Sequence, residues 1–184
     1  MPEKFKIDDS AVIPPAPAEE AKELPILRGP NIKPFPKTSP LDESIDAPCS
    51  LKVGDNITTD HIMPAGAKIL PLRSNIPAIS KPLFLGVKAV LVKSFARIHR
   101  ANLINAGILP LTFVNEADYD KIGQGDELSL ENVRQDIIDG KSKLTIVNKS
   151  KNAEIPVLCE LSGRTKDIVL AGGLLDYTRE QLTK

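Results

Sequence analysis

The chain has 184 residues, enough for one domain with its own hydrophobic core. Its 24 basic and 24 acidic residues cancel, and aromatic residues make up only 4% of it. A neutral chain with few aromatic rings argues against nucleic-acid binding and against attachment to an anionic membrane. The longest apolar run, residues 82–92, contains Lys88 and is shorter than the ~20 residues that a membrane span needs.

The first residues and the two cysteines favour a cytoplasmic location. Residues 1–9 are too acidic for a signal or transit peptide. Cys49 and Cys159 are isolated, so they form no disulfide framework and no CxxC motif, which fits a reducing compartment. Each is expected to act as a small buried apolar side chain. Two cysteines cannot hold an iron–sulfur cluster, which needs three or four thiolate ligands.

Residues 1–49 are predicted to form a Pro-rich extended arm or linker. Most of the 16 prolines lie in this stretch, and proline disfavours both helices and sheet interiors. Apolar residues recur between the prolines more often than in a typical disordered linker. The arm is therefore expected either to pack irregularly across an apolar surface or to remain a loose tail.

Residues 50–184 are predicted to form one α/β domain. A strand, a helix and a strand between residues 86 and 114 predict a parallel βαβ unit with a right-handed crossover. The expected strands span residues 50–53, 86–93, 108–114, 127–130, 143–147 and 154–160. The expected helices or helical turns span residues 95–106, 116–122, 132–138, 165–171 and 174–182.

The candidate site lies in the polar stretch that follows the first predicted strand. Thr58, Thr59, Asp60 and His61 place two hydroxyls, a carboxylate and an imidazole on adjacent residues, and Arg73 adds a guanidinium suited to a carboxylate. Nearby prolines and a glycine predict a loop, where functional groups are often displayed. The Asp60–His61 pair could handle protons, or it could be a turn with satisfied hydrogen bonds.

Residues 93–99, Lys-Ser-Phe-Ala-Arg-Ile-His, are predicted to have a structural role. Ser94 is expected to cap the following helix, Phe95 and Ile98 to pack, and Arg97 to pair locally. A metal-ligand role for His99 is disfavoured because no partner residues stand at ligand spacing. Residues 122–127, Ile-Gly-Gln-Gly-Asp-Glu, are predicted to be a turn at the entry to a strand, because no phosphate-loop helix follows.

The segment Asp55–His61, followed by Pro64-Ala65-Gly66, resembles the opening loop of the C-terminal swivel domain of aconitase. The Ser-Phe-Ala-Arg-Ile element is similar to one shared by aconitases and isopropylmalate dehydratase small subunits. The resemblance implies a swivelling three-layer β/β/α domain. It also implies that Thr59, Asp60 and His61 line a substrate cleft and that Arg73 grips a substrate carboxylate. The family reaction interconverts citrate and isocitrate, through cis-aconitate, on a [4Fe–4S] cluster.

One segment of the family is missing. Between the positions that match Ser80 and Pro82, relatives carry a core strand and a helix that begins with a catalytic Ser-Ser-Arg loop; this sequence has neither the insertion nor that tripeptide. The resemblance therefore implies a domain that lacks one strand–helix unit and the serine base. The chain alone is expected to be inactive, with a [4Fe–4S] cluster supplied only by cluster-bearing domains or a cluster-bearing subunit that would share the tricarboxylate substrate. The alternatives are a docking or regulatory module, or the small subunit of a split iron–sulfur hydro-lyase.

Overall fold

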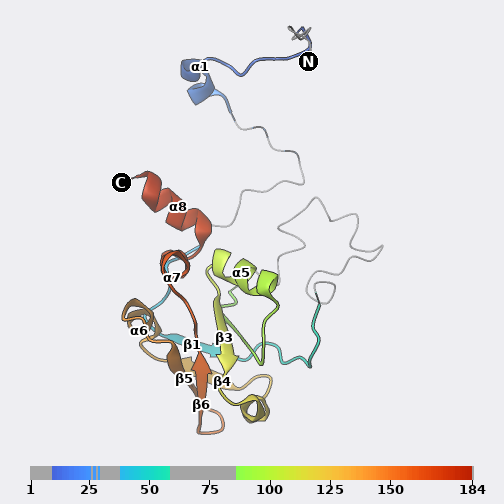
Figure 1. Ribbon diagram of the computed structural model, residues 1–184, viewed down its shortest axis with the longest axis vertical. Coiled ribbons are helices and arrows are strands. Elements are labelled where there is room, and N and C mark those ends of the chain that lie inside the picture. The colour runs from blue at the N-terminus through green and yellow to red at the C-terminus, as the bar shows by residue number, and fades with distance from the viewer. Residues whose placement is uncertain (1–9, 26, 28, 30–37, 59–85, 184) are drawn as a thin grey trace, which may run out of the picture.

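The structure is a computed structural model that describes residues 10–25, 27, 29, 38–58 and 86–183 (Figure 1). Within these residues no helix is both long and apolar enough to cross a membrane. The elements, in chain order, are α1 (Ala18–Glu23), β1 (Ile45–Pro48), β2 (Ala89–Val92), α5 (Arg97–Asn105), β3 (Leu109–Phe113), the 3-10 helix η2 (Glu116–Lys121), β4 (Glu127–Leu130), α6 (Val133–Ile138), β5 (Lys143–Asn148), β6 (Ala153–Leu158), α7 (Arg164–Ala171) and α8 (Leu174–Leu182).

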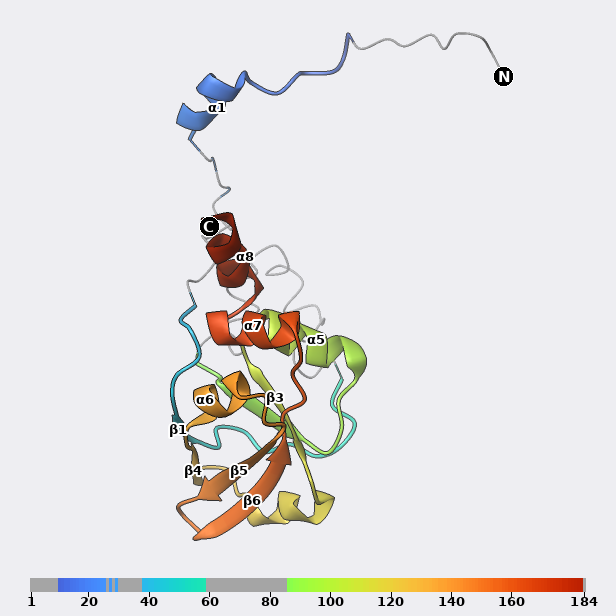
Figure 2. The same cartoon turned by 60° about the vertical axis from the view of Figure 1, so that its left-hand side comes forward.

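The six described strands form one mixed sheet in the order β1-β4-β5-β6-β3-β2. β2 and β3 are parallel, and all the other neighbouring pairs are antiparallel. Helices α5 and α7 lie side by side and cover the sheet near β3 (Figure 2). The α/β class predicted from the sequence is confirmed. The predicted loss of a strand–helix unit between Ser80 and Pro82 lies outside the described residues.

The predicted parallel unit is present as β2, α5 and β3. Ala89 pairs with Leu109 and Val92 with Thr112, so the two strands run in register, and α5 connects them. Gly107 follows the helix with a positive φ of 73°, a conformation that glycine adopts without strain. The unit forms because a continuous apolar strand can be buried on both faces while its helix covers one of them.

The core lies between this unit and the β5–β6 hairpin. Val157 and Ile155 on β6 and Leu109 and Leu111 on β3 are fully buried. Along β5 and β6, buried and exposed residues mostly alternate, as expected for a sheet with one covered face. The hairpin turns at Asn152, whose φ is 50°, so the predicted pairing of these strands is confirmed.

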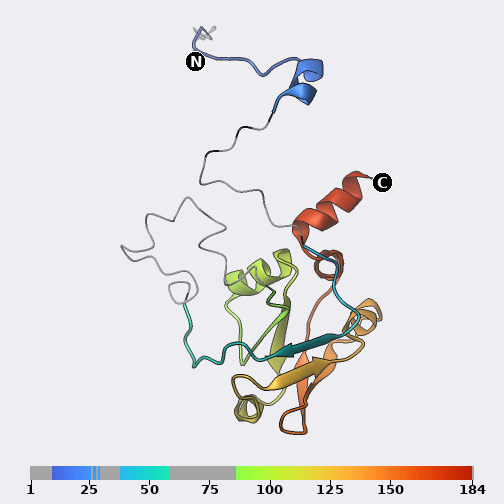
Figure 3. The same ribbon diagram turned by 180° about the vertical axis from the view of Figure 1, so that it is seen from behind.

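The described residues before position 59 differ from the sequence prediction in three places. Residues 18–23 form helix α1 and residues 45–48 form strand β1, whereas irregular chain was predicted through residue 49. Residues 50–53, predicted as a strand, form none. β1 lies at the edge of the sheet beside β4 (Figure 3). Proline lacks a backbone N–H, and at an edge Pro48 can end the strand without removing a hydrogen bond from the interior of the sheet.

Residues 38–48 are attached to the helical side of the domain as well as to the sheet. The Leu41 amide donates to the Leu170 carbonyl at 3.2 Å, and the Arg134 guanidinium donates to the Leu41 carbonyl at 2.8 Å. Gly172 (φ 92°) lies directly against the Ser39 carbonyl, so closely that a Cβ atom would overlap it. This part of the predicted arm is therefore built into the folded body.

Candidate functional site

The four predicted cleft residues, Thr59, Asp60, His61 and Arg73, lie outside the described residues. The structure therefore does not report whether they come together, and their roles remain predictions. It does describe the chain that leads to them, residues 50–58, and the surface of the domain against which that chain is held.

The leading chain is fixed by a cluster around Tyr119, a residue of η2. The Lys52 ammonium donates to the carbonyls of Tyr119 at 3.1 Å and Ile122 at 2.7 Å, and it lies 4.1 Å from the centre of the Tyr119 ring. The Tyr119 hydroxyl donates to the Val53 carbonyl at 2.6 Å. The Phe113 ring meets Tyr119 edge-on, with centroids 6.2 Å apart. Two consecutive residues of the leading chain are thus bonded to one aromatic residue.

A second lysine approaches the same ring from the end of β2. The Lys93 ammonium lies 5.2 Å from the ring centre of Tyr119 and 3.1 Å from the Asp55 carboxylate. The hydrogen bond to Asp55 is the main reason why the pKa of Lys93 is raised, so this lysine stays protonated at neutral pH. Lys52, Tyr119, Lys93 and Asp55 form what we call the tyrosine clamp. Sequence reasoning missed it because its members lie up to 67 residues apart.

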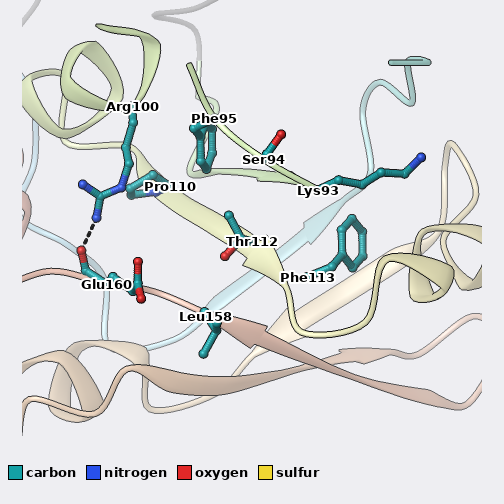
Figure 4. A pocket seen from close by; sticks show the side chains of 9 residues that line it. All are labelled: Lys93, Ser94, Phe95, Arg100, Pro110, Thr112, Phe113, Leu158 and Glu160. Atoms are coloured by element: carbon teal, nitrogen blue, oxygen red, sulfur yellow. Dashed lines mark hydrogen bonds between the residues drawn. The ribbon is translucent and has the colours of Figure 1, made fainter. Parts of the chain in front are cut away.

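A cavity of about 280 Å³ opens next to the clamp, at the ends of the parallel strands (Figure 4). Its apolar lining includes Phe95 and Leu158, and polar groups, including Arg100 and Glu160, line the rest. Arg100 donates a hydrogen bond to the backbone carbonyl of Glu160, which joins α5 to the chain just beyond β6. Among the described residues of the lining, Glu160 is the one carboxylate, and none is a histidine or a cysteine. These described residues therefore include no carboxylate–histidine or carboxylate–carboxylate pair.

The segment after β2 only partly follows its predicted role. Helix α5 begins at Arg97 after Ala96, and no side chain caps it, so the prediction of Ser94 as the cap is wrong. The extended conformation of Ala96 moves the start of the helix beyond the reach of that hydroxyl. Phe95 is half-buried and its ring lies 5.9 Å from His99, so its predicted packing is confirmed.

Ile98 and Arg97 are both exposed. Ile98 is 71% exposed, so its predicted packing is wrong, because it falls on the outward face of the first helical turn. Arg97 is exposed and forms no ion pair with the described residues.

The predicted turn at residues 122–127 is confirmed, and it carries a partly buried network that the sequence did not reveal. The Asp126 carboxylate accepts from the Gly123 amide at 2.6 Å and from the Asn148 side chain at 2.7 Å, and Lys151 lies 2.9 Å away. These donors, the Gly123 amide first, lower the pKa of Asp126 to about 2. Asn148, fully buried, also accepts the Lys151 amide. The turn is a structural joint between β4 and β5.

The residues present do not fit an iron–sulfur cluster. Cys49 is half-buried, and Cys159 is buried, which raises the pKa of its thiol to about 12. A thiol with so high a pKa resists the deprotonation that metal binding requires. Across the described ranges, no three His, Cys, Asp or Glu side chains gather in a way that could hold a metal ion.

Part of the chain is similar to known proteins. Residues 77–116 match the family described as the aconitase C-terminal domain, and this segment includes β2, α5 and β3. A probable mitochondrial aconitate hydratase of Dictyostelium discoideum is 41% identical over 110 residues, which cover 58% of this chain and 14% of that protein. A putative mitochondrial aconitate hydratase of Emericella nidulans is 39% identical over 103 residues, covering 54% of this chain and 13% of that protein.

Two further proteins are similar over other lengths. The mitochondrial homocitrate dehydratase of Saccharomyces cerevisiae is 59% identical over 56 residues, covering 30% of this chain and 7% of that protein. The crystal structure of a 3-isopropylmalate dehydratase from Methanocaldococcus jannaschii is 29% identical with a TM-score of 0.42, covering 65% of this chain and 59% of that one. The chain is thus similar to these aconitate hydratases over somewhat more than half of its own length, and it spans about one seventh of theirs.

Proposed function

We propose that this chain is an aconitase-like swivel segment that contributes one edge of a carboxylate-binding cleft to a separate, cluster-bearing partner. The observation that carries the proposal is the match of residues 77–116 to the aconitase C-terminal domain. That segment folds into a complete parallel strand–helix–strand unit, so the similarity falls on the structural centre of the domain.

The proposed division of labour follows from the side chains that the chain has and from those that it lacks. Thr59, Asp60, His61 and Arg73 would bind and orient the carboxylate substrate. A planar guanidinium such as that of Arg73 can bind a carboxylate with two parallel hydrogen bonds. The partner would hold the [4Fe–4S] cluster, which supplies Lewis-acid chemistry when bound. The tricarboxylate substrate would be shared between the two proteins.

We further propose that the chain alone has no hydro-lyase activity. The sequence contains no Ser-Ser-Arg tripeptide, and the described residues that line the cavity include a single carboxylate, Glu160. Removing a general base typically lowers a rate by about 10²- to 10⁴-fold. The same side chains allow a second role, as the small subunit of a split hydro-lyase, if a partner supplies the base.

The test uses the purified 184-residue chain, with and without the cluster-bearing domains of an aconitase from which the C-terminal domain has been removed. Hydration of cis-aconitate is followed by absorbance, and complex formation is followed by calorimetry. We expect no turnover by the chain alone and measurable binding to the cluster-bearing domains. Turnover by the chain alone would refute the proposed inactivity, and absence of binding would refute the swivel role. Turnover only in the mixture would favour the small-subunit role.

A matched pair of arginine variants tests the cleft itself. Arg73→Ala should weaken citrate binding to the mixed complex by about tenfold or more, since a shielded bidentate pair contributes roughly 1.5–3 kcal/mol. Arg97→Ala, an exposed arginine on α5, should leave it unchanged. Equal effects of the two variants on citrate binding would show that Arg73 does not bind the substrate.

The cytoplasmic location remains a proposal. The relatives named above carry the word mitochondrial in their names. Cell fractionation with an antibody against the chain would decide between the two compartments, and recovery in the mitochondrial fraction would refute the cytoplasmic one.

A further inference from the structure

We propose that Tyr119 is a positioning residue for the carboxylate-binding edge. Together with Lys52 and Lys93 it fixes residues 52–55, from which the chain continues toward Thr59–His61. The inference rests on the proposed function, because positioning matters only if that edge binds a substrate with a partner. The local effect of the clamp can nevertheless be measured without a partner.

Side-chain contacts, rather than pairing in the sheet, hold residues 51–55 against the domain. The backbone pairing of β1 with β4 continues as far as Cys49, which bonds to Gly125 and to the Asp126 carbonyl. Between Leu51 and Asp55, no backbone–backbone hydrogen bond joins this stretch to another described residue. Its attachment to the described part of the domain therefore depends on the hydrogen bonds of Lys52, Val53 and Asp55. Their partners are Tyr119, Ile122 and Lys93.

The clamp also sets which way the leading chain faces. The Lys52 side chain points inward to the η2 carbonyls, whereas Leu51 and Val53 on either side are 69% and 43% exposed. In extended chain successive side chains point to opposite sides, so fixing Lys52 fixes the direction of its neighbours. The Tyr119 hydroxyl bond to the Val53 carbonyl adds a second point of attachment, which prevents rotation about the first.

The electrostatic arrangement favours one orientation of the two lysines. Both ammonium groups lie within the range in which a cation is attracted to an aromatic face. Two like charges near one ring would repel, but each has a compensating acceptor: backbone carbonyls for Lys52 and the Asp55 carboxylate for Lys93. The ring therefore attracts two cations that are each already paired, and it links residue 52 to the end of β2.

The first experiment measures trypsin cleavage after Lys52 in the full-length chain. Trypsin must take up the lysine side chain, so a clamped Lys52 is protected and cleavage reports opening of the clamp. Tyr119→Phe removes only the hydroxyl and should speed the cut about fivefold, the effect of losing one ordinary hydrogen bond. Tyr119→Leu also removes the aromatic face and should speed it more than tenfold.

The matched control is the chain's other tyrosine. Tyr177 on α8 lies 5.8 Å from the Arg164 guanidinium, so it is also a tyrosine beside a cation, but it is distant in sequence from the leading chain. Tyr177→Leu should leave the Lys52 cut within twofold of the unmodified protein. Unchanged cleavage in both Tyr119 variants, with a urea midpoint showing that they fold, would overturn the inference.

The second experiment separates this inference from the proposed function. Affinity for the cluster-bearing domains is measured for the unmodified chain and for Tyr119→Phe, Tyr119→Leu and Tyr177→Leu. Binding that falls at least tenfold in Tyr119→Leu, is partly restored in Tyr119→Phe and persists in Tyr177→Leu supports positioning. Equal binding by all four proteins overturns it. If the unmodified chain does not bind, the proposed function fails, and faster cleavage at Lys52 would still support the clamp.

Discussion

Replacing Gly172 with alanine tests whether residues 38–41 are an integral part of the domain. Gly172 has a φ of 92°, and an added Cβ atom would overlap the Ser39 carbonyl. Gly140 has a similar φ of 77°, but no atom lies within 4 Å of the position of its Cβ. The two alanine variants therefore share a backbone penalty, and only one of them has a collision.

The magnitude follows from these two terms. Alanine in a left-handed conformation costs roughly 1–2 kcal/mol, which is the whole expected effect of Gly140→Ala. In Gly172→Ala the chain at Ser39 must also move. That movement strains the Leu41–Leu170 and Arg134–Leu41 hydrogen bonds, each worth about 1 kcal/mol. We expect a total loss of about 3–4 kcal/mol for Gly172→Ala.

The assay is urea unfolding followed by circular dichroism, with thermal melting as a check. A loss of about 3–4 kcal/mol corresponds to a Tm lower by roughly 6–16 °C, compared with about 2–8 °C for Gly140→Ala. The slope of the urea transition should not change, because the surface exposed on unfolding is the same. Equal losses in the two variants would show that the Ser39 segment is not held against α7, and the account of residues 38–48 would be refuted.

Three further predictions concern acid stability, the core and the thiols. The folded pKa of Asp126 is about 2, below its ordinary value, so the stability that its charge contributes is present above about pH 4 and is lost as pH falls toward 2. Asp126→Asn should therefore lower the free energy of unfolding at pH 7 but change it little at pH 2. An equal loss of stability at both pH values, measured by urea unfolding, would contradict this. Leu111→Ala should cost about 2–5 kcal/mol in urea unfolding, whereas Leu175→Ala, at a 54% exposed position, should cost far less, and similar losses would place the core elsewhere. With a thiol reagent at pH 8, Cys49 should react in the native protein and Cys159 only after unfolding, because burial raises the thiol pKa more strongly at Cys159. Reaction of both thiols in the native protein would refute this.

The sequence predicted the part of the fold that is encoded locally. Residues 86–182 alternate between apolar strand segments and segments with helix boundaries, so the parallel unit, the β5–β6 hairpin and the pair of closing helices could all be predicted. The turn at 122–127 was predictable for the same reason, because its glycines and Asp126 lie within six residues. The resemblance in residues 55–66 predicted similarity to aconitases, and residues 77–116 match the aconitase C-terminal domain.

Tertiary structure decided what depended on residues far apart in the chain. The strand at 45–48 forms because β4 offers it an edge, although its own sequence contains Pro48. The tyrosine clamp joins residues 52–55 to Tyr119, more than sixty positions later in the chain, and the periodicity of the sequence does not predict such a contact. Local patterns follow from the covalent chain, whereas edge pairing and side-chain clusters follow from which surfaces meet after the chain has folded.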